Sequence, residues 1–522
     1  MAGLIIGSKE YLINMKVHLA LITLETNSPL FLSAGDEHLV QDNLLIRDHH
    51  NLPVIHASQI TGALRHLYQR TFDDASWQCL FGQTNDESNA ASILVPSNTV
   101  LRDINHQMVP LYCPHADITA DPLLANLLED APVIIDRVKL NNYGVVDNKF
   151  DYTVVPTGYR FSFTIELKDL ADKYDTAWQN VLQLFEHHLF KLGGATKSGF
   201  GVFKLVTEHS VQFSFDYKNK AHKQALLDWN QHPSTFPVEF IQSQQQHNHS
   251  CLVWPKQNAF TQDIYNAEFK FSAKQGLHFG ASEQGLSHWF INLSDAKTSD
   301  KPGNQVKQIE RLPKITWTKK ANGRLIAKSY VYPVIPTTAV KGAVLQQARY
   351  LLSRGFQQYL PALELLTGKV EEDKVNPDNT HSQASVMDWY VSFNYIPTYL
   401  EDCAPENPIE ANFFRNHNRI NRLTGGVMQG GLFSEEYTWQ DEFELRITLD
   451  YYRLEMLLAH PDANPSNVTM NEVRIVLAVI DRAIADFNDE LAKLGGLTSM
   501  GYGSVSVEEV QSLRDIQFAK EA

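Results

Sequence analysis

The spacing of apolar side chains divides the chain into expected strands and helices. Residues 16–24 and 268–271 alternate apolar and polar positions, which is typical of strands with one buried face. Residues 178–191 and 471–494 space their apolar positions as amphipathic helices do, the second through Val473, Ile475, Val476, Ile480 and Ile484. Strands and helices in this mixed order predict an α+β fold with ferredoxin-like or RRM-like cores.

Four local patterns occur twice, in the same order. An apolar strand with a proline leads into a small-residue turn and a helix at 52–65 and again at 332–344. The other pairs are Leu-Phe-Gly at 80–82 with Leu-Thr-Gly at 366–368, Ile-Asp-Arg at 135–137 with Ile-Asn-Arg at 420–422, and glycine-rich turns at 192–202 and 494–505. The offsets, taken at Gly62, Gly82, Arg137 and Gly193, are 280, 286, 285 and 302 residues. This slow drift predicts two homologous domains with loops of different length.

We place the first domain at residues 10–210 and the second at 263–512. Residues 211–262 between them are expected to form a connector, because they include a polar, unpatterned run at 242–249. Residues 295–311, rich in Lys, Asp, Gly and Pro, are expected to be an insertion in the second domain.

Composition fits a globular protein but argues against general coating of nucleic acid. Hydrophobic residues make up 43% of the 522 positions, and the formal net charge is −15. Affinity for phosphates comes mainly from Lys and Arg, so an RNA site here needs a local surplus of positive charge. The four cysteines form no CxxC pair, and no segment approaches the length of a membrane span or a signal peptide. We therefore expect a cytoplasmic protein without membrane contacts.

The duplicated motifs resemble the RAMP superfamily of CRISPR-associated proteins. The two glycine-rich turns are similar to its signature loop, and residues 53–65 are similar to its strand–turn–helix segment. With Leu-Phe-Gly and Ile-Asp-Arg, the set is closest to the backbone subunits of type III effectors, and the duplication is similar to the double subunits of type III-D variants. The resemblance covers most of both halves, residues 15–207 and 266–508.

The chain departs from the family's pattern at the two helix starts. The first domain has Ala57, Ser58 and Gln59 where the family often has Gly-Ser-Ser, and Thr61 where it has Lys. The second domain keeps Lys341 but has Leu345 at the position of Arg65. Each domain thus retains one of the two usual cations.

The resemblance implies a prokaryotic subunit that binds guide crRNA, meets target RNA paired to the guide, and assembles with other CRISPR effector subunits. Helix starts and glycine-rich turns suit phosphates, because they can present backbone N–H groups, although ordinary N-caps and a tight helix-to-strand turn would look the same. In the second turn, Met500 is expected to replace the cation that the first turn has. The RNA-binding residues expected are Ser58, Gln59, Thr61, Arg65, Arg137, Gly193, Gly194, Thr196, Lys197, Ser198, Thr337, Thr338, Lys341, Arg422, Gly495, Gly496, Thr498 and Ser499.

A cleavage residue is also implied by the resemblance. Asp42 falls on the family's cleaving position, a few residues before the apolar strand at 44–48. A carboxylate there would bind a divalent ion, with Mg²⁺ expected, or help activate a ribose 2′-hydroxyl. Asp36, Glu37 and His38 are weaker candidates, and an exposed turn Asp is the plain alternative. The second domain shows no clear equivalent, with Lys314 near the expected position and Asp295 and Asp300 of the insertion as acidic alternatives.

Two long stretches, 101–152 and 390–437, lie where the family inserts a β-hairpin thumb between guide bases. Arg137 and Arg422 are expected at the bases of these thumbs, with Val146 and Met428 as wedges. Ordinary packed excursions are the alternative.

Two other chemistries are considered. Zinc is not expected, because Cys113, His115 and His106 match no standard zinc spacing. A metal-independent endoribonuclease that processes guide RNA remains an alternative function, as does a purely structural RNA-binding subunit.

Overall fold

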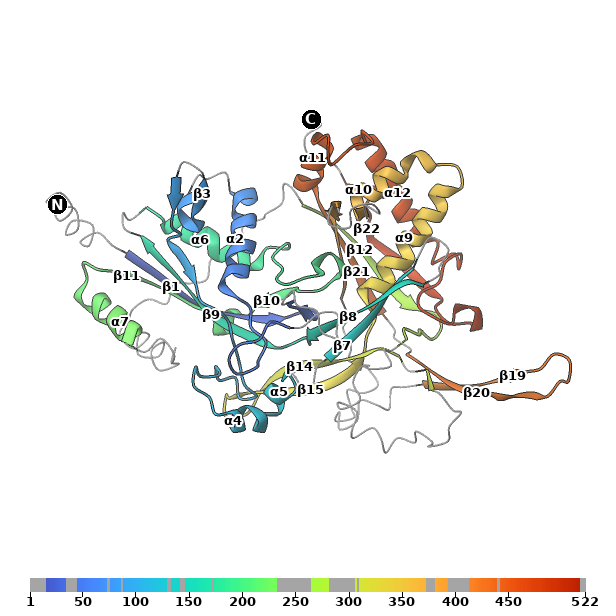
Figure 1. Cartoon of the computed structure of the whole chain (residues 1–522), viewed down its shortest axis with the longest axis horizontal. Coiled ribbons are helices and arrows are strands. Elements are labelled where there is room, and N and C mark those ends of the chain that lie inside the picture. The colour runs from blue at the N-terminus through green and yellow to red at the C-terminus, as the bar shows by residue number, and fades with distance from the viewer. Residues whose placement is uncertain are drawn as a thin grey trace.

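The computed structural model describes residues 16–33, 45–72, 76–85, 88–128, 133–140, 146–169, 173–231, 264–280, 306–307, 309–371, 381–392, 413–438 and 442–516. Asp42, Asp36, Glu37 and His38 lie outside these residues. The two halves of the chain form two domains that lie side by side (Figure 1). Among the described residues, no helix has both the length and the apolar character needed to cross a membrane.

The first domain has the βαββαβ order of a ferredoxin-like fold. Its sheet is antiparallel with strand order β10-β1-β9-β5, and β6 and β11 add to β9 and β1. Strand β11 continues this sheet past residue 210, where the connector was expected to begin. The six core elements are β1 (Lys16–Thr26), α2 (Ala57–Thr71), β5 (Leu94–Pro96), β9 (Arg160–Asp169), α6 (Asp175–Gln183) and β10 (Phe203–Leu205), with β6 (Val100–Leu101) and β11 (Val211–Asp216) beside them.

The second domain repeats this topology. Its sheet order, β18-β21-β12-β22, matches that of the first domain strand for strand, which confirms the predicted duplication and fold class. Helices α9 and α12 pack against each other over this core. The elements are β12 (Ile264–Ala273), α9 (Thr337–Ser353), β18 (Met387–Ser392), β21 (Glu442–Asp450), α12 (Met470–Ala485) and β22 (Val505–Gln511).

The remaining elements connect or extend the two cores. In the first domain they are β2 (Leu30–Phe31), α3 (Trp77–Phe81), β3 (Gln83–Asn85), β4 (Ser88–Ala90), α4 (His115–Ala120), α5 (Pro122–Ala125), β7 (Val133–Leu140), β8 (Val146–Val155), η1 (Leu184–Glu186), η2 (Thr196–Ser198), η3 (Thr207–His209) and α7 (Lys220–Gln231). In the second they are β13 (Val306–Lys307), β14 (Arg311–Lys319), β15 (Leu325–Pro333), η4 (Gln357–Tyr359), α10 (Leu360–Thr367), β16 (Gly368–Glu371), β17 (His381–Ala384), β19 (Phe413–Ile420), β20 (Val427–Tyr437), α11 (Tyr451–Ala459) and η7 (Thr498–Met500).

Matching hydrogen bonds establish which residues of the two domains are equivalent. The backbone N–H of Lys168 donates to the carbonyl of Ile93, and the backbone N–H of Asp450 donates to the carbonyl of Val386. Lys168 therefore corresponds to Asp450, and Ile93 corresponds to Val386. In the same way, the backbone N–H of Val54 donates to the carbonyl of Ile46, and that of Val334 donates to the carbonyl of Glu310. Glu310 therefore occupies the position of Ile46, and the strand at 44–48 corresponds to residues 308–312. The earlier match of this strand to Lys314 was wrong, because β14–β15 is a hairpin inserted after it.

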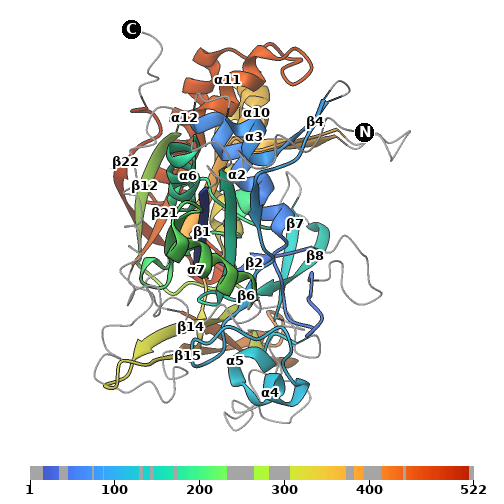
Figure 2. The same ribbon diagram turned by 90° about the vertical axis from the view of Figure 1, so that its left-hand side faces the viewer.

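Hairpin β14–β15 belongs to the second domain but packs under the first. It lies beside α4 and α5 in both views (Figures 1 and 2). Its Ile315 and Ala327 are part of the first domain's hydrophobic core, and Trp317 donates its indole N–H to the carbonyl of Gly158 at 2.8 Å. The two domains therefore share apolar packing as well as polar contacts.

Candidate nucleic-acid interface

Four ion pairs between described residues join the two domains and bring predicted RNA-binding residues to the joint; the fourth, between Lys191 and Asp388, is described with the charge of the joint below. Arg137 makes two hydrogen bonds of 2.9 Å with Glu310. Lys197 of the first glycine turn lies 2.8 Å from a carboxylate oxygen of Asp388 in β18. The third pair links Arg70, at the end of α2, to Asp450 with two hydrogen bonds of 2.8 and 2.9 Å, and both of its side chains are almost fully buried.

The two glycine turns have the same backbone conformation. Ala195 and Leu497 are left-handed, with φ of 52° and 57°, and Gly199 and Gly501 follow with φ of 89° and 96°. Left-handed backbone at these positions costs least for glycine. The match places Ser499 at the position of Lys197 and Met500 at that of Ser198. The loss of the cation in the second turn is thus due to Ser499, and the assignment to Met500 was wrong.

The glycine pairs at the start of each turn serve packing. Gly194 donates its N–H to the carbonyl of Phe31 at 2.8 Å, and Gly496 donates to that of His278 at 2.7 Å. A side chain at Gly193 or Gly495 would collide with the same two carbonyls. These two N–H groups are therefore used inside each domain, and the expectation that they stay uncovered for a phosphate was wrong.

The first glycine turn packs against the start of helix α9 in the second domain. Gly199 lies so close to the side chain of Thr337 that a Cβ atom would overlap it. Lys341, one turn further along α9, donates from Nζ to the carbonyl of Lys197 at 3.3 Å. This contact brings together five of the predicted residues, namely Thr196, Lys197, Ser198, Thr337 and Lys341, from the two halves of the sequence.

The start of α2 uses several predicted residues locally. Gln59 accepts the N–H of His56 in a capping box, and Thr61 donates its hydroxyl to the carbonyl of Ala57. Arg65 lies over the ring of Trp77, 5.3 Å from its centroid. Ser58 is exposed. The N-cap interpretation therefore accounts for Gln59, and Thr61 forms an ordinary backbone contact.

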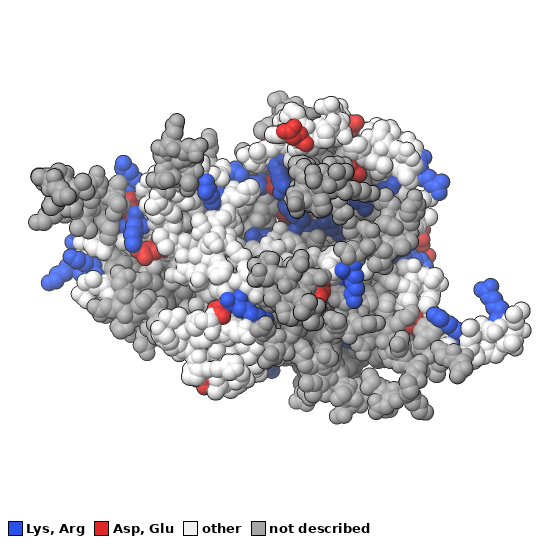
Figure 3. All heavy atoms as spheres, viewed as in Figure 1, with Lys and Arg blue, Asp and Glu red and all other residues white. Residues whose placement is uncertain are grey.

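Positive charge exceeds negative charge at the joint. Lys191 and Lys197 both pair with Asp388, at 3.3 and 2.8 Å, and Lys341 and Arg349 add two further cations that act on the same cluster. We call Lys191, Lys197, Lys341, Arg349 and Asp388 the joint cluster. In Figure 3, Lys and Arg atoms gather in the hollow between the two halves of the molecule. The joint cluster supplies the local charge that the chain's overall balance of −15 lacks.

Burial within the joint cluster lowers lysine pKa values. Burial, together with the charges of Lys197, Arg349 and Lys191, lowers the pKa of Lys341 to about 8, against the pull of Asp388. Burial also lowers the pKa of Lys191, while Asp388 acts in the opposite direction. The cluster holds more positive charge than its own carboxylate neutralises, so an added anion would stabilise it.

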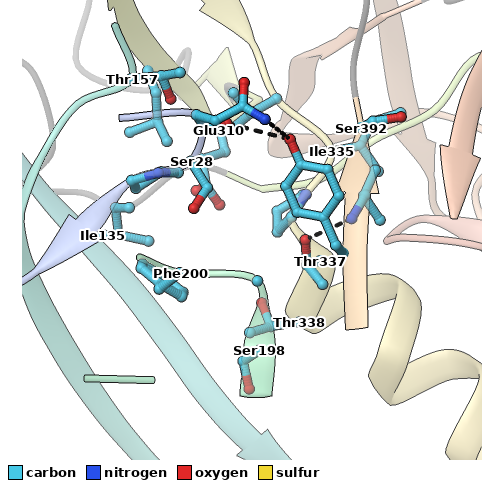
Figure 4. A pocket seen from close by; sticks show the side chains of 18 of the residues that line it. Ser28, Ile135, Thr157, Ser198, Phe200, Glu310, Ile335, Thr337, Thr338 and Ser392 are labelled. Atoms are coloured by element: carbon cyan, nitrogen blue, oxygen red, sulfur yellow. Dashed lines mark hydrogen bonds between the residues drawn. The ribbon is translucent and has the colours of Figure 1, made fainter. Parts of the chain in front are cut away.

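A pocket of about 420 Å³ opens beside the joint cluster, between the domains. Ser198 and Phe200 line it from the first glycine turn, and Thr337 and Thr338 line it from the start of α9 (Figure 4). Tyr390 also lines it, and its hydroxyl accepts a hydrogen bond of 3.1 Å from the side-chain amide of Asn27 in the first domain. Its volume lies within the roughly 300–1,000 Å³ typical of small-molecule sites.

Both expected thumbs are β-hairpins, β7–β8 and β19–β20. Phe413 pairs with Tyr437 as Val133 pairs with Val154, so Arg137 corresponds to His417 and not to Arg422. Arg422 lies in the exposed turn at the tip of β19–β20, and Arg137 lies within strand β7; neither is at a hairpin base as expected. Met428 is half exposed beside this tip. Val146 begins β8, and its side chain is outside the described part of the structure.

Among the described residues, one group of side chains of metal-binding types lies close together, away from the joint. Donor atoms of His18, Asp169 and Asp175 fall within 4.8 Å of one another, but Asp175 is also bound by Lys16 at 3.0 Å. His106 accepts a hydrogen bond from Arg160 at 2.9 Å, and burial lowers its pKa to about 2. His106 is therefore engaged in a buried polar network with Arg102 and Arg160.

Comparison with protein-family models agrees with the paired topology. The model of the RAMP superfamily matches residues 23–204 and 271–506. The chain belongs to the RAMP superfamily. The two matched segments cover both ferredoxin-like domains, and membership supports a CRISPR-associated role in RNA binding. No curated protein matches the chain significantly.

Proposed function

We propose that this RAMP protein is a backbone subunit of a type III CRISPR effector complex and holds the guide RNA across its domain joint. The surplus of positive charge in the joint cluster carries the proposal. In a chain with 60 acidic and 45 basic residues, such a surplus has a specific location, between a glycine turn and a helix start. A phosphate there would gain both charge and helix N–H donors. Guide pairing would supply sequence specificity, while the protein would recognise backbone and shape.

The position and the tip of hairpin β19–β20 support its assignment as a thumb that separates guide bases. It projects from the body of the second domain (Figure 1). Its tip exposes apolar side chains that ordinary folding would bury, with Leu423 97% and Ile420 60% exposed. Apolar side chains inserted between base steps can unstack them. We assign the wedge to this tip, with Leu423 foremost and Met428 beside it.

Target cleavage is assigned to the first domain. Asp42 stands three residues before Leu45, and Val306 stands three residues before the equivalent Ile309. Asp42 would hold a Mg²⁺ ion, which lends Lewis-acid assistance at the scissile phosphate. A valine cannot bind a metal, so the second domain would hold RNA without cutting it.

Binding of a single-stranded RNA of about 40 nucleotides tests the RNA site. Lys341→Gln and Arg349→Gln each remove one cation and leave the interdomain ion pairs of Arg70, Arg137, Lys191 and Lys197 intact. We expect each to raise the dissociation constant several-fold and to reduce the slope of log K against log salt by about 0.7, the value for one single-strand phosphate contact. Lys168→Gln, an exposed lysine in β9, is the matched control and should change neither quantity. Equal salt slopes for all four proteins would contradict the proposal.

Proton uptake provides a second test of the same site. A bound phosphate raises the pKa of Lys341 from about 8 toward its ordinary value, so binding at pH 8.5 should take up a larger fraction of a proton than binding at pH 7. Calorimetry in two buffers of different ionisation enthalpy measures this uptake. Lys341→Arg should bind RNA without it, because arginine stays charged. Uptake that persists in Lys341→Arg would place the titrating group elsewhere.

The lowered pKa of Lys341 also affects stability in a defined direction. Because its folded pKa lies below its unfolded value, the charged form destabilises the fold at pH values below about 8. This cost shrinks as the pH rises from about 8 toward the unfolded value.

A further inference from the structure

Three side chains of metal-binding types converge at the start of helix α6 in the first domain. His18 comes from β1, Asp169 is the last residue of β9, and Asp175 is the first residue of α6. One donor atom of each lies within 4.8 Å of the other two. The group lies on the side of the first domain that is away from the second, so it is separate from the joint cluster (Figure 1).

Strand register brings two of these side chains to one face of the sheet. Strand β1 pairs with β9 so that His18 stands opposite Leu167 and Lys16 stands opposite Asp169. Asp169 is therefore the diagonal neighbour of His18 on the same face. The next three positions of β1 on this face, 20, 22 and 24, are apolar core residues. An imidazole in such a row needs polar partners, and the carboxylates lie where they can serve as partners.

Burial and local contacts fix the orientation of two of the three groups. His18 is 2% exposed, and Asp169 is fully buried. The ring of His18 stacks on that of Trp178 in the first turn of α6, with centroids 5.5 Å apart. One carboxylate oxygen of Asp169 accepts the backbone N–H of Tyr174 at 2.8 Å. Both ligands are thus oriented before an ion binds, which reduces the entropy cost of binding.

The distances and the donor set suit a divalent transition-metal ion. Nε2 of His18 lies 3.2 Å from a carboxylate oxygen of Asp175. Ligand bonds of about 2.1 Å place neighbouring ligand atoms about 3.0 Å apart in octahedral geometry and about 3.4 Å apart in tetrahedral geometry. Imidazole with two carboxylates suits Zn²⁺ or Mn²⁺, whereas Mg²⁺ prefers oxygen ligands alone. The side chain of Asp175 is 59% exposed, so water can complete the coordination.

Lys16 supplies positive charge to this group in the structure. Its Nζ lies 3.0 Å from the second carboxylate oxygen of Asp175. A divalent ion would neutralise the two carboxylates without Lys16, whose side chain is 24% exposed and reaches solvent. Lys16 and a metal ion would therefore compete for Asp175.

We infer that His18, Asp169 and Asp175 form a binding site for one divalent transition-metal ion, which fastens the start of α6 to the sheet, and that Lys16 competes with this ion. Zn²⁺ should bind more tightly than Mn²⁺, as the order of affinities for such donors requires. An ordinary ion pair between His18 and Asp175 is the alternative, and it makes no use of Asp169. The inference does not depend on the proposed function.

Zinc binding by the full chain tests the site. Protein freed of metal with a chelator is dialysed against buffered Zn²⁺, and the bound zinc is counted. The wild type should hold one ion more than Asp175→Ala, and this ion should raise the midpoint of thermal unfolding by about 2 °C or more at saturation. Glu166→Gln, on the opposite face of β9, is the matched control and should behave as wild type. Equal zinc content in the wild type and Asp175→Ala would overturn the inference.

Lys16→Gln separates a metal site from an ordinary ion pair. Removing the competing ammonium should tighten zinc binding by about two- to fivefold, the equivalent of one partly exposed ion pair. Zinc binding that is unchanged or weaker in Lys16→Gln would overturn the competition. Both variants alter partly exposed side chains, and circular dichroism checks that they fold.

The choice of ion is tested with the same thermal measurement. Mn²⁺ should raise the midpoint less than Zn²⁺ does at equal concentration, and Mg²⁺ should leave it unchanged. A rise with Mg²⁺ equal to that with Zn²⁺ would overturn the assignment to a transition-metal ion.

Discussion

Target RNA paired to the guide should be cut by the wild-type complex with Mg²⁺ and left intact by the Asp42→Ala complex. Asp42 supplies the carboxylate for the ion or for activation of the 2′-hydroxyl, so its loss should slow cleavage by at least about 100-fold, in the range for a positioned acid–base group. Gel analysis of end-labelled target measures the rate, and EDTA should abolish the same cut in the wild type.

The neighbouring residues supply the controls for this experiment. Asp36→Ala and His38→Ala should keep cleavage within a few-fold of wild type, and guide binding should be equal in all variants. Since Val306 occupies the matching position of the second domain, no cut should remain in the Asp42→Ala complex. A persistent cut would identify a second nuclease centre, and unchanged cutting would make the chain a scaffold.

Removing Arg70 should destabilise the protein more than removing any exposed arginine. Burial alone would raise the pKa of Asp450, but the hydrogen bonds and charge of Arg70 bring it below its ordinary value. Arg70→Ala leaves that carboxylate buried without its partner, which costs about 3 kcal/mol or more in the free energy of unfolding. Guanidinium unfolding followed by tryptophan fluorescence measures the loss.

Two comparisons separate the buried pair from general surface effects. Arg514→Ala breaks the exposed pair with Glu509 and should cost under about 1 kcal/mol. Because Asp450 contributes stability only above its lowered pKa, the deficit of Arg70→Ala should shrink as the pH falls below about 4. A deficit that is independent of pH would assign it to lost packing, including the contact of Arg70 with the ring of Tyr452.

Several features of the fold could be predicted from local sequence because local chemistry decides them. The glycine turns need left-handed backbone, so their glycines recur at matching positions in both copies. Helix α12 begins with the capping box of Thr469 and Glu472, and its predicted face is buried at Val473, Val476, Ile480 and Ile484. Ile475 departs from this prediction, being 38% exposed, because it lies off the stripe that faces α9.

The register of the long hairpins could not be predicted from motif similarity. Residues 135–137 and 420–422 are similar in sequence, yet strand pairing aligns Arg137 with His417, five residues away. Cross-strand hydrogen bonds set register, and a short motif carries no information about its partner strand. The same limitation led to the wrong match at Lys314, since the inserted hairpin β14–β15 shifts every later position.

The sequence by itself determined the duplication, the α+β class and the position of the glycine turns, because turns, caps and apolar periodicity depend on neighbouring residues. Only the tertiary structure decided which charges remain available to a ligand. Lys197 and Arg137 were predicted from sequence as RNA contacts, and both are engaged across the domain joint with carboxylates that lie 191 and 173 residues away. Ion pairs between distant segments depend on how the domains dock, and that docking brings Lys191 and Lys197 of the first domain to Asp388 and Lys341 of the second.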